Sequence, residues 1–535
     1  MSKIRSLIMW ALFLSVFPSL ALALTGDVVV SFPTPGTCPT GLTFDGKNLW
    51  MADHKSDSLY SIDRASGRIT KALASPGYRS MGLTWDGQNL WVLDGEENLI
   101  FQLDPESGLA KKTLYAPSSG PLGLAWDGKY LWVSDSREDK IFQISTDDGT
   151  TINSIPSPSG TPQGICFDGK YLWVADRYDD KIFMVTPEDG EVIICFDSPG
   201  AYARGLAWDG NFLWNVDYQT DSLYKLRIYD SENYSRTEKK TELLEYTHEF
   251  RNYGPGTVQD LDIYLAVPED LNSQKLLEKI SYNPEPTGFL SDRWDQKVAH
   301  YRFRNLGNTQ FVRVGMKIKA ELFDVRYFVF PEKVGTLNDV PRGIRRKYLA
   351  DDTKFALDDP FIQKSAKEAV GDEKNPFWIA RKIFNYVIGK MHYELAGGWN
   401  IAPTVLKRGS GSCSEYSFVY IALCRASGLP ARYAGSVVIR GDDASSDEVF
   451  HRWVEVYLPN YGWIPVDPSG GDRDTPYQRS QAFGHLSNRF LITTLGGGGS
   501  EYLEWGYNSN ERWTSLGQCK IYVEHIGEWS PLAEE

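Results

Sequence analysis

Cys413 is the residue whose sequence surroundings best suit a nucleophile. It follows the segment 409–412 (Gly-Ser-Gly-Ser), and Ser412 with Glu415 forms the Ser-x-x-Glu pattern of a helix capping box. This pattern predicts that Cys413 is the first residue of a helix. The positive end of a helix dipole lowers the pKa of a thiol at that position and favours the thiolate, which is the nucleophilic form.

A thiolate that attacks an amide also needs a proton donor for the departing amine, and His451 and Asp467 are the candidates for this role. Segments 450–457 (FHRWVEVY) and 462–468 (GWIPVDP) predict two strands joined by a turn. Antiparallel counting brings Asp467 within a few residues of His451 across the ladder. A carboxylate at that place can orient an imidazole. We therefore predict a triad of Cys413, His451 and Asp467.

Helical signals surround the cysteine. Asn375-Pro376 predicts the N-cap and first residue of a helix. Its apolar face is predicted to contain Ala380, Ile383, Phe384, Val387 and Ile388. Cys424, eleven residues after Cys413, is interpreted as a small core residue of the next helix. The nucleophile is thus expected on a helix and its partners on strands, in an α+β core.

Several segments around these residues resemble the transglutaminase-like superfamily of papain-type thiol enzymes. Cys, His and Asp follow one another in the order and local contexts of that family, and the resemblance covers about residues 341–500. The segments that carry it are Gly411-Ser412-Cys413, Leu423 to Tyr433 (LCRASGLPARY), His451 to Val456 (HRWVEV), Gly462-Trp463 and Val466-Asp467-Pro468. The preceding β segment resembles the β domain that often precedes this core in microbial relatives.

This resemblance implies a role for each member of the triad. Cys413 would be the nucleophile, His451 the general base and acid, and Asp467 the group that orients His451. The backbone N–H of Cys413 would be one oxyanion donor. Animal members of the family use a tryptophan as the second donor; that role stays open here, with Trp399 preferred to Trp378 as the candidate.

No cofactor and no metal site is predicted. The calcium sites of the animal enzymes are not visible in this sequence, and the acidic segment 442–448 (DDASSDE) lacks the spacing of a calcium loop. We interpret this segment as a solvated loop. The sequence also lacks His-Glu-x-x-His, paired zinc-type cysteines and a phosphate-binding glycine loop.

A repeat of 41 residues dominates the first half of the chain. Its units begin with related segments at Gly41, Gly82, Gly123, Gly164 and Gly205. Each unit predicts four strands, the first two joined by an Asp-Gly turn, which is the pattern of a β-propeller blade. The segment Gly26–Pro35 matches the last strand of the other units, so we expect it to complete the fifth blade. The predicted five-bladed β-propeller spans residues 24–230.

Two residue types recur once in every repeat. We interpret the tryptophans as packing between blades and the aspartates as turn caps, rather than as a ligand-binding ring or a cation site. The recurring residues are Trp50, Trp91, Trp132, Trp173 and Trp214, and Asp53, Asp94, Asp135, Asp176 and Asp217. Ligand contacts are expected instead at positions that vary between repeats, namely His54, Gly95, Ser136, Arg177 and Tyr218, and Thr40, Met81, Leu122, Gln163 and Arg204.

The rest of the chain divides into three further predicted parts. Asp230–Thr241 (DSENYSRTEKKT) has the composition of a linker, and the alternating residues that follow predict a β-sandwich, so 231–340 is a linker with a β-sandwich domain. Residues 341–500 form the transglutaminase-like catalytic domain, and residues 501–535 form a C-terminal extension. The predicted fold class is multidomain: an all-β five-bladed propeller, a β-sandwich, then an α+β papain-like core.

The N-terminal residues predict export from the cytoplasm. Lys3 and Arg5 precede an apolar run, and Ala21-Leu22-Ala23 fits a cleavage site, so residues 1–23 are interpreted as a signal peptide. The expected localisation is secreted, periplasmic or cell-surface, with no membrane span after cleavage. Six cysteines in 535 residues are too few for a disulfide scaffold. A net charge of −14 argues against nucleic acid as a partner.

These observations predict a secreted thiol enzyme that acts on amide bonds through a thioester. Hydrolysis of a peptide or glutamine amide is slightly favoured over glutamine–lysine cross-linking, because transfer needs a site that excludes water and positions an amine. The expected partners are a protein or peptide substrate and a protein or glycan bound by the propeller. The alternative function is a non-catalytic extracytoplasmic binding or scaffold protein whose propeller recruits such ligands.

Overall fold

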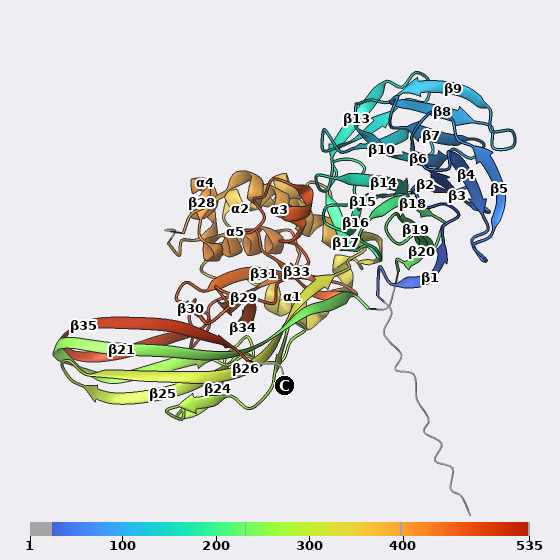
Figure 1. Ribbon diagram of the computed structural model, residues 1–535. Helices are drawn as coiled ribbons and strands as arrows, with labels where there is room; N and C mark the ends of the chain where they lie inside the picture. The colour runs from blue at the N-terminus through green and yellow to red at the C-terminus, as the bar shows by residue number, and fades with distance from the viewer. Residues whose placement is uncertain (1–23, 230–231, 396–397, 533–535) are drawn as a thin grey trace, which may run out of the picture.

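The computed structural model describes residues 24–229, 232–395 and 398–532. They form a ring of small sheets, an elongated pair of β layers, and a mainly helical body that lies against both (Figure 1). The predicted signal peptide, residues 1–23, lies outside the described residues. Within the described part of the chain, no helix is both long enough and apolar enough to cross a membrane.

The N-terminal ring consists of five four-stranded antiparallel sheets. The first strands of successive sheets, β2, β6, β10, β14 and β18, contact one another in turn, and β18 returns to β2. The sheets contain β2 (Pro39–Phe44), β3 (Leu49–Asp53), β4 (Ser58–Ile62) and β5 (Ile69–Ala74); β6 (Ser80–Trp85), β7 (Leu90–Asp94), β8 (Leu99–Leu103) and β9 (Ala110–Tyr115); β10 (Pro121–Trp126), β11 (Leu131–Asp135), β12 (Lys140–Ile144) and β13 (Thr151–Pro156); β14 (Pro162–Phe167), β15 (Leu172–Asp176), β16 (Lys181–Val185) and β17 (Val192–Asp197); and β18 (Ala203–Trp208), β19 (Phe212–Asp217), β20 (Ser222–Arg227) and β1 (Val28–Pro33).

The first strand of the ring pairs with the last. β1 runs antiparallel to β20, with Phe32 opposite Leu223. The ring of Phe32 also stacks on Trp214, with 6.4 Å between centroids. The prediction that the N-terminal strand completes the fifth sheet is therefore confirmed, and this sheet joins the two ends of the repeat region.

The recurring tryptophans and aspartates have structural roles, as interpreted from the sequence. Trp214 is fully buried and packs against Leu42 and Met51 of the neighbouring sheet, while its Nε1 donates to Asp209 Oδ2 at 2.9 Å. The other four tryptophans each donate to the aspartate of their own Asp-Gly turn in the same way. Asp53 is fully buried and accepts the backbone N–H groups of Cys38 and Ser56, at 2.7 and 2.8 Å.

The elongated body is a three-stranded ribbon that folds back on itself into two layers. β21 pairs with β26 along its first half, with β25 along its second half, and with β35 along most of its length. Tyr246 on the first half bonds Ser509 on the other layer, and both halves contribute to one apolar core. The strands are β21 (Tyr234–Ala266), β22 (Gln274–Leu276), β23 (Ser281–Asn283), β24 (Gly288–Ser291), β25 (Lys297–Leu306), β26 (Phe311–Tyr327), β30 (Ser445–Asp447), β33 (His485–Leu486) and β35 (Ser509–Pro531).

Two expected segments differ from this arrangement. Most of the polar segment 230–241, expected as a linker, is the start of β21, where Tyr234 pairs with Tyr327. Its composition resembles that of a linker because none of its described residues is buried. The segment 501–535, expected as an extension, contains β35, whose Trp529 is buried in the core shared by the two β layers. Its main partner, β21, lies more than 240 residues earlier in the chain, and its short partner β30 lies about 80 residues earlier, so no local pattern predicts these contacts.

The third body packs helices against a four-stranded sheet of order β32–β31–β29–β34. Its longest helix, α3, begins after Asn375, whose side chain accepts the N–H of Phe377 at 2.9 Å, as the sequence predicted. The elements are η1 (Pro331–Lys333), η2 (Leu337–Asp339), α1 (Arg342–Tyr348), α2 (Pro360–Val370), α3 (Pro376–Lys390), β27 (His392–Tyr393), α4 (Ala402–Arg408), β28 (Ser410–Gly411), α5 (Cys413–Ala426), β29 (Ala431–Val438), β31 (His451–Leu458), β32 (Gly462–Val466), α6 (Pro476–Ser480) and β34 (Phe490–Gly496).

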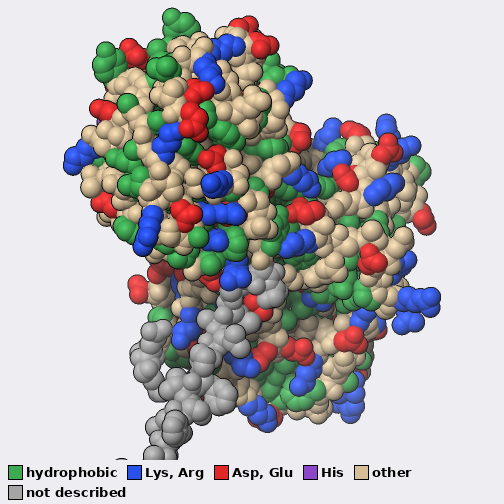
Figure 2. Space-filling model, turned by 90° about the vertical axis from the view of Figure 1, so that its right-hand side faces the viewer, with side chains coloured by type: hydrophobic (Ala, Val, Ile, Leu, Met, Phe, Trp, Pro, Cys, Tyr) green, Lys and Arg blue, Asp and Glu red, His purple; other side chains and the backbone are tan. Residues whose placement is uncertain are grey.

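The ring docks on this helical body through its fourth sheet. Arg381 on α3 pairs with Glu191 at 2.9 Å and also donates to the carbonyl of Val192 at 3.1 Å. The ring of Tyr477 on α6 packs edge-on against Phe183, with 5.1 Å between centroids. On the face drawn in Figure 2, Lys and Arg side chains are interspersed with Asp and Glu side chains over the surface.

Candidate active site

Cys413 is the first residue of helix α5, as the capping box predicted. Ser412 is the N-cap; its side chain accepts the N–H of Glu415, and the Glu415 carboxylate accepts the N–H of Ser412 at 3.3 Å. All residues from 413 to 425 are buried, so the helix runs through the core of the domain. Cys413 itself is 8% exposed. The fold thus holds the thiol at the positive end of a buried helix.

The carboxylate of Glu415 fixes this helix end. It is fully buried and pairs with Arg408 at 2.6 Å, and it also accepts the backbone N–H of Asn400 at 3.0 Å. A buried carboxylate needs such partners because burial penalises its charge. The sequence indicated Glu415 as a capping residue only. Its contacts with α4 and the segment before it also hold the loop that precedes Cys413.

His451 and Asp467 lie side by side on the neighbouring sheet. The register of β31 and β32 pairs Val454 with Val466, which places Asp467 two residues along from His451, as antiparallel counting expected. His451 Nε2 lies 2.8 Å from Asp467 Oδ2. The other ring nitrogen is then the one available to Cys413, whose thiol makes a hydrogen bond with His451. The structure therefore brings all three predicted residues together.

The Asp467 carboxylate is itself held in place. Its Oδ1 accepts the hydroxyl of Ser469 at 2.7 Å and the backbone N–H of Gly470 at 3.2 Å, which leaves Oδ2 for His451. The imidazole stacks on Phe490, with 5.6 Å between ring centroids. These contacts restrict the rotation of both side chains, so the pair keeps its geometry without a substrate.

The three groups shift one another's ionisation. Burial opposes the charged form of Cys413, but the hydrogen bond and charge of His451 outweigh it and lower the pKa of the thiol. Burial likewise opposes a charged His451, and Asp467 outweighs it and raises the pKa of the imidazole. The pKa of Asp467 is lowered, since His451 outweighs its burial. Together these shifts favour a thiolate beside an imidazolium.

Cys413 opens into a cavity of about 650 Å³. Trp399 lines this cavity, whereas Trp378 packs at the contact with the N-terminal ring, away from the thiol. One wall comes from the segment Trp505–Glu511, which sequence analysis had separated from the catalytic domain. A second cavity of about 370 Å³ borders His451 and Asp467 and shares no lining residue with the first.

Arg452 is a residue of this site that sequence reasoning passed over. It is fully buried, its backbone N–H donates to the sulfur of Cys413, and its guanidinium lies 4.4 Å from the ring centroids of Tyr433 and Tyr507. A buried cation next to the thiol adds to the field that favours the thiolate. The available signal was an arginine in a strand that is otherwise rich in apolar residues, next to Trp453 and Val454.

Two other expectations concern residues near the triad. Cys424 is fully buried and burial raises its pKa, so the interpretation as a core residue is confirmed. The segment 442–448, expected as a solvated loop, is exposed at five of its seven residues, and its centre is also anchored. Ser445–Asp447 forms β30 against β35, and buried Asp447 accepts the backbone N–H of Val438 at 2.7 Å. Its carboxylate also accepts the backbone N–H groups of Val449 and Phe450 and thereby caps a turn.

Comparison with known proteins gives one family match and several distant relatives. Residues 363–468 match the family model of the transglutaminase-like superfamily. The chain is 26% identical over 132 residues to an uncharacterised protein of Haemophilus influenzae, covering 20% of this chain and 36% of that protein. It is 32% identical over 71 residues to the uncharacterised protein YebA of Bacillus subtilis, covering 11% and 10%.

The matched segments span much less than two thirds of either relative. Among solved structures, a proposed cysteine protease from Cytophaga hutchinsonii aligns at 15% identity and a TM-score of 0.40, over 56% of this chain and 94% of that one. The family match covers α3, α5, β29, β31 and β32, and it includes the thiol, the imidazole and the carboxylate described above. Residues 363–468 are therefore a domain of the transglutaminase-like superfamily.

Proposed function

We propose that this chain is a thiol enzyme that acts on amide bonds, with Cys413 as nucleophile. The observation that carries the proposal is the continuous line of contacts from the Cys413 thiol through His451 to Asp467, at the start of a buried helix. Nucleophilic catalysis by cysteine needs this combination of a lowered thiol pKa and an adjacent, oriented base. The superfamily match of residues 363–468 supports the same class of enzyme.

In the first half of the reaction, the Cys413 thiolate attacks the amide carbon. The negative charge moves to the carbonyl oxygen, where the backbone N–H of Cys413 at the helix start is one donor. Collapse of this intermediate breaks the C–N bond, and His451 gives its proton to the departing amine or ammonia. The acyl group remains on the sulfur as a thioester. Trp399, which lines the cavity, is the candidate second donor.

In the second half, water resolves the thioester. His451 is now neutral and takes a proton from the water, whose oxygen attacks the thioester carbon. The C–S bond breaks, the thiolate is restored beside the imidazolium, and a carboxylic acid leaves. Asp467 stays ionised throughout and holds the ring in place. We propose hydrolysis of a peptide or glutamine amide as the outcome.

Cross-linking of glutamine to lysine is the second candidate, and one observation favours it. The cavity that borders His451 and Asp467 is separate from the cavity that holds Cys413. A lysine amine in the former would attack the thioester in place of water and make an amide, with His451 as base. Transfer requires that this amine be held at high effective concentration, because water is present at about 55 M.

One experiment separates these outcomes. Protein of residues 24–535 is incubated with a glutamine-containing protein and a labelled primary amine, and products are identified by mass spectrometry. We expect ammonia release or peptide cleavage that depends on Cys413, with little incorporation of the amine. The Cys413→Ala variant should release no ammonia and cleave no peptide. The Cys519→Ser variant, which changes a partly exposed cysteine on β35, should keep this activity.

Each alternative gives a different result. Incorporation of the amine in excess of hydrolysis would assign the cross-linking function. Equal product with the Cys413→Ala variant, or no Cys413-dependent chemistry towards a panel of proteins, would favour a non-catalytic binding or scaffold protein. Selective labelling of Cys413 by a thiol probe checks that the protein used is correctly folded.

We further propose that the N-terminal ring is a five-bladed β-propeller that recruits the substrate. At one end of the ring, Arg177 stacks 3.8 Å above Tyr202, which lies 5.3 Å from Tyr218. Arg177 and Tyr218 are among the positions that vary between repeats. A partly exposed group of arginine and tyrosine side chains is typical of contact surfaces for proteins or glycans.

Recruitment by the ring can be tested with two substrates. Arg177→Ala should lower kcat/KM for a whole protein by about tenfold, in the range of a single contact residue, and leave kcat/KM for a short peptide unchanged. Arg137→Ala on the neighbouring sheet serves as the control. Equal effects of Arg177→Ala on both substrates would contradict recruitment. The proposed place of action is outside the cytoplasm, which the signal peptide at 1–23 supports.

A further inference from the structure

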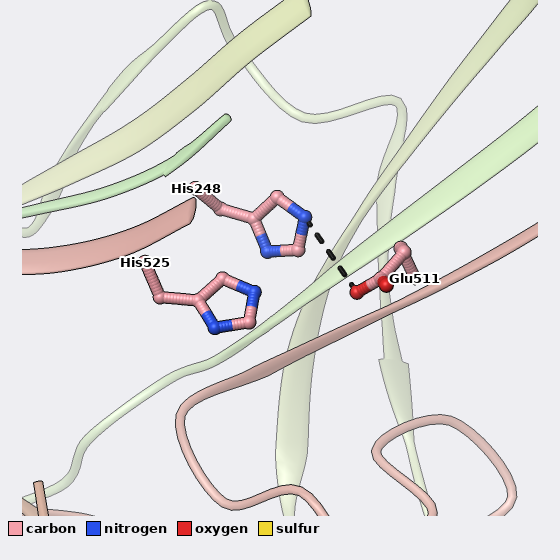
Figure 3. Close-up of side chains that lie close together, drawn as sticks. All are labelled: His248, Glu511 and His525. Carbon is pink, nitrogen blue, oxygen red and sulfur yellow. Dashed lines mark ion pairs between the residues drawn. The ribbon is translucent and has the colours of Figure 1, made fainter. Parts of the chain in front are cut away.

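Three potential metal ligands meet between the two β layers of the elongated body. His248 lies on β21, while Glu511 and His525 lie in the first and second halves of β35, and all three side chains point toward one another (Figure 3). The ligand atoms of the three residues are within 4.8 Å of one another, and His248 Nε2 is 3.8 Å from Glu511 Oε2. The two imidazole rings are 4.5 Å apart between centroids.

His248 is buried and His525 is half-buried, and each has a ring nitrogen without a partner. His248 has no exposed surface, and its Nδ1 lies 3.0 Å from the Ser509 hydroxyl, which can accept the ring proton and leave the lone pair on Nε2. Nε2 of His248 and Nε2 of His525 have no hydrogen-bond partner among the described residues. A buried polar atom without a partner costs about 1–3 kcal/mol.

The cluster borders the cavity that contains Cys413. Glu511 and His525 are part of the cavity lining, and His248 lies behind them in the core. Three protein ligands occupy three positions of a tetrahedral ion, and the fourth position then faces the cavity. A water molecule or a polar group of a bound molecule can fill that position.

We propose that His248, Glu511 and His525 bind a divalent transition-metal ion, and that zinc is the ion this donor set fits best. Two imidazoles and one carboxylate match the ligand preference of zinc, whereas calcium and magnesium prefer oxygen ligands alone. Zn–N bonds of about 2.0–2.1 Å place ligand atoms roughly 3.3 Å apart in a tetrahedron. The flexible side chain of Glu511, which is 22% exposed, can close the present gap to His248. This site does not rest on the proposed enzymatic function.

The ion would join parts of the molecule that are distant in sequence. Ser509, bonded to His248, also bonds the hydroxyl of Tyr246 at 2.7 Å, so the second contact layer of the site is already formed. The ion would connect β21 to both halves of β35. It would thereby fix the cavity wall that precedes Glu511. No sequence pattern predicts this site, because its ligands are up to 277 residues apart.

Cobalt binding tests this site directly. The protein of residues 24–535 carries Cys413→Ala, so that no thiol is left to bind the ion together with His451, and it is first stripped with a chelator. Titration with Co²⁺ should give visible absorption bands typical of tetrahedral coordination, with one ion per chain, and Zn²⁺ should displace the cobalt. Zinc should also raise the melting temperature, because an ion that binds the folded state alone stabilises it.

Matched variants locate the site. Glu511→Gln and His525→Gln should each weaken cobalt binding at least tenfold and abolish the zinc-dependent shift in melting temperature. His300→Gln should change neither; it removes an imidazole from β25 of the same body, where His300 lies 2.6 Å from Asp262. The proposal is overturned if the stripped protein binds no stoichiometric cobalt, or if the Glu511→Gln and His525→Gln proteins, folded by circular dichroism, bind cobalt as tightly as their parent.

Discussion

Burial raises the pKa of the Cys413 thiol, whereas the groups around it lower that pKa. An isolated buried thiol stays protonated, as Cys424 on the same helix illustrates, where burial raises the pKa. Cys413 differs in having His451 beside it, together with the backbone N–H of Arg452. The pair is stable as thiolate and imidazolium because Asp467 compensates the charge of the ring. Reactivity is therefore a property of the three residues together.

Replacement of His451 should show this dependence. In His451→Gln, burial of Cys413 remains while the imidazolium is lost, so the thiol pKa rises above its ordinary value. Alkylation by iodoacetamide at pH 6 should slow at least tenfold, since each unit of pKa changes the thiolate fraction about tenfold at such a pH. His485→Gln, which removes an imidazole paired with Asp324 at 2.8 Å, is the control. An unchanged rate in His451→Gln would contradict the pairing.

Replacement of Asp467 should shift the alkaline limb of the profile of kcat/KM against pH. Asp467→Asn keeps a similar shape but removes the charge that raises the pKa of His451, so the imidazolium is lost at lower pH. The alkaline limb of the pH–rate profile should shift downward, and turnover should fall about 100-fold or more, as for a misdirected general base. The measurement is kcat/KM against pH. A uniform loss with an unshifted alkaline limb would indicate a merely structural role.

At the scale of elements, β35 connects the two β layers of the elongated body to the helical body that contains Cys413. It pairs with β21 and β30, and the segment just before it lines the Cys413 cavity. Trp529 near its end is 2% exposed and lies in the shared apolar core, whereas Trp513 near its start is 41% exposed. The two tryptophans therefore differ in burial within one strand.

This difference predicts unequal effects of the same substitution. Trp529→Ala should lower the free energy of unfolding of the β layers by about 3–5 kcal/mol, because it leaves a cavity in a packed core. Trp513→Ala should cost about 1 kcal/mol or less. Urea unfolding followed by circular dichroism measures both. Equal losses would mean that the end of β35 is not held in the core.

Local patterns made some elements predictable and left others hidden. The start of α5 and the hairpin of His451 and Asp467 depend on residues within about sixteen positions, so capping and strand counting found them. The first residues of β21 pair on one side only and are largely exposed, so their polar composition looked like a linker. β35, Arg452 and His248 make contacts with segments that are distant in the sequence. Capping and strand-spacing patterns concern residues that are close in the sequence, so they could not predict these contacts.

At the scale of the molecule, the N-terminal ring and the helical body that contains Cys413 meet through a largely buried ion pair. Arg381 is 5% and Glu191 is 16% exposed, and Asn385 donates to the same carboxylate. Removing one partner of such a pair leaves the other charge uncompensated, at a cost of about 3–5 kcal/mol. The contact thus couples the stability of the two parts.

The Glu191→Gln substitution should uncouple the unfolding of the ring from that of the helical body. We expect calorimetry to show two separate unfolding transitions in place of overlapping ones, with unchanged secondary structure. Asp197→Asn, which removes the 79% exposed partner of Lys181 on the same sheet, should have little effect, since exposed pairs contribute about 0–1 kcal/mol. If the Glu191→Gln protein unfolds like its parent, apolar contacts such as that of Phe183 with Tyr477 are sufficient to couple the unfolding of the two parts.

The position of β35 late in the chain also sets an order of events during translation. A ribosome makes the chain from its N-terminus, so Cys413, His451 and Asp467 emerge before Trp505–Glu511 and the strand that follows. Until then β21 pairs with β25 and β26 on one edge and lacks β35 on the other, and the thiol has no finished cavity around it. A nascent chain therefore carries the Cys413 thiol before the cavity beside it is complete. The lining of that cavity is complete only after His525, in the second half of β35, has been made.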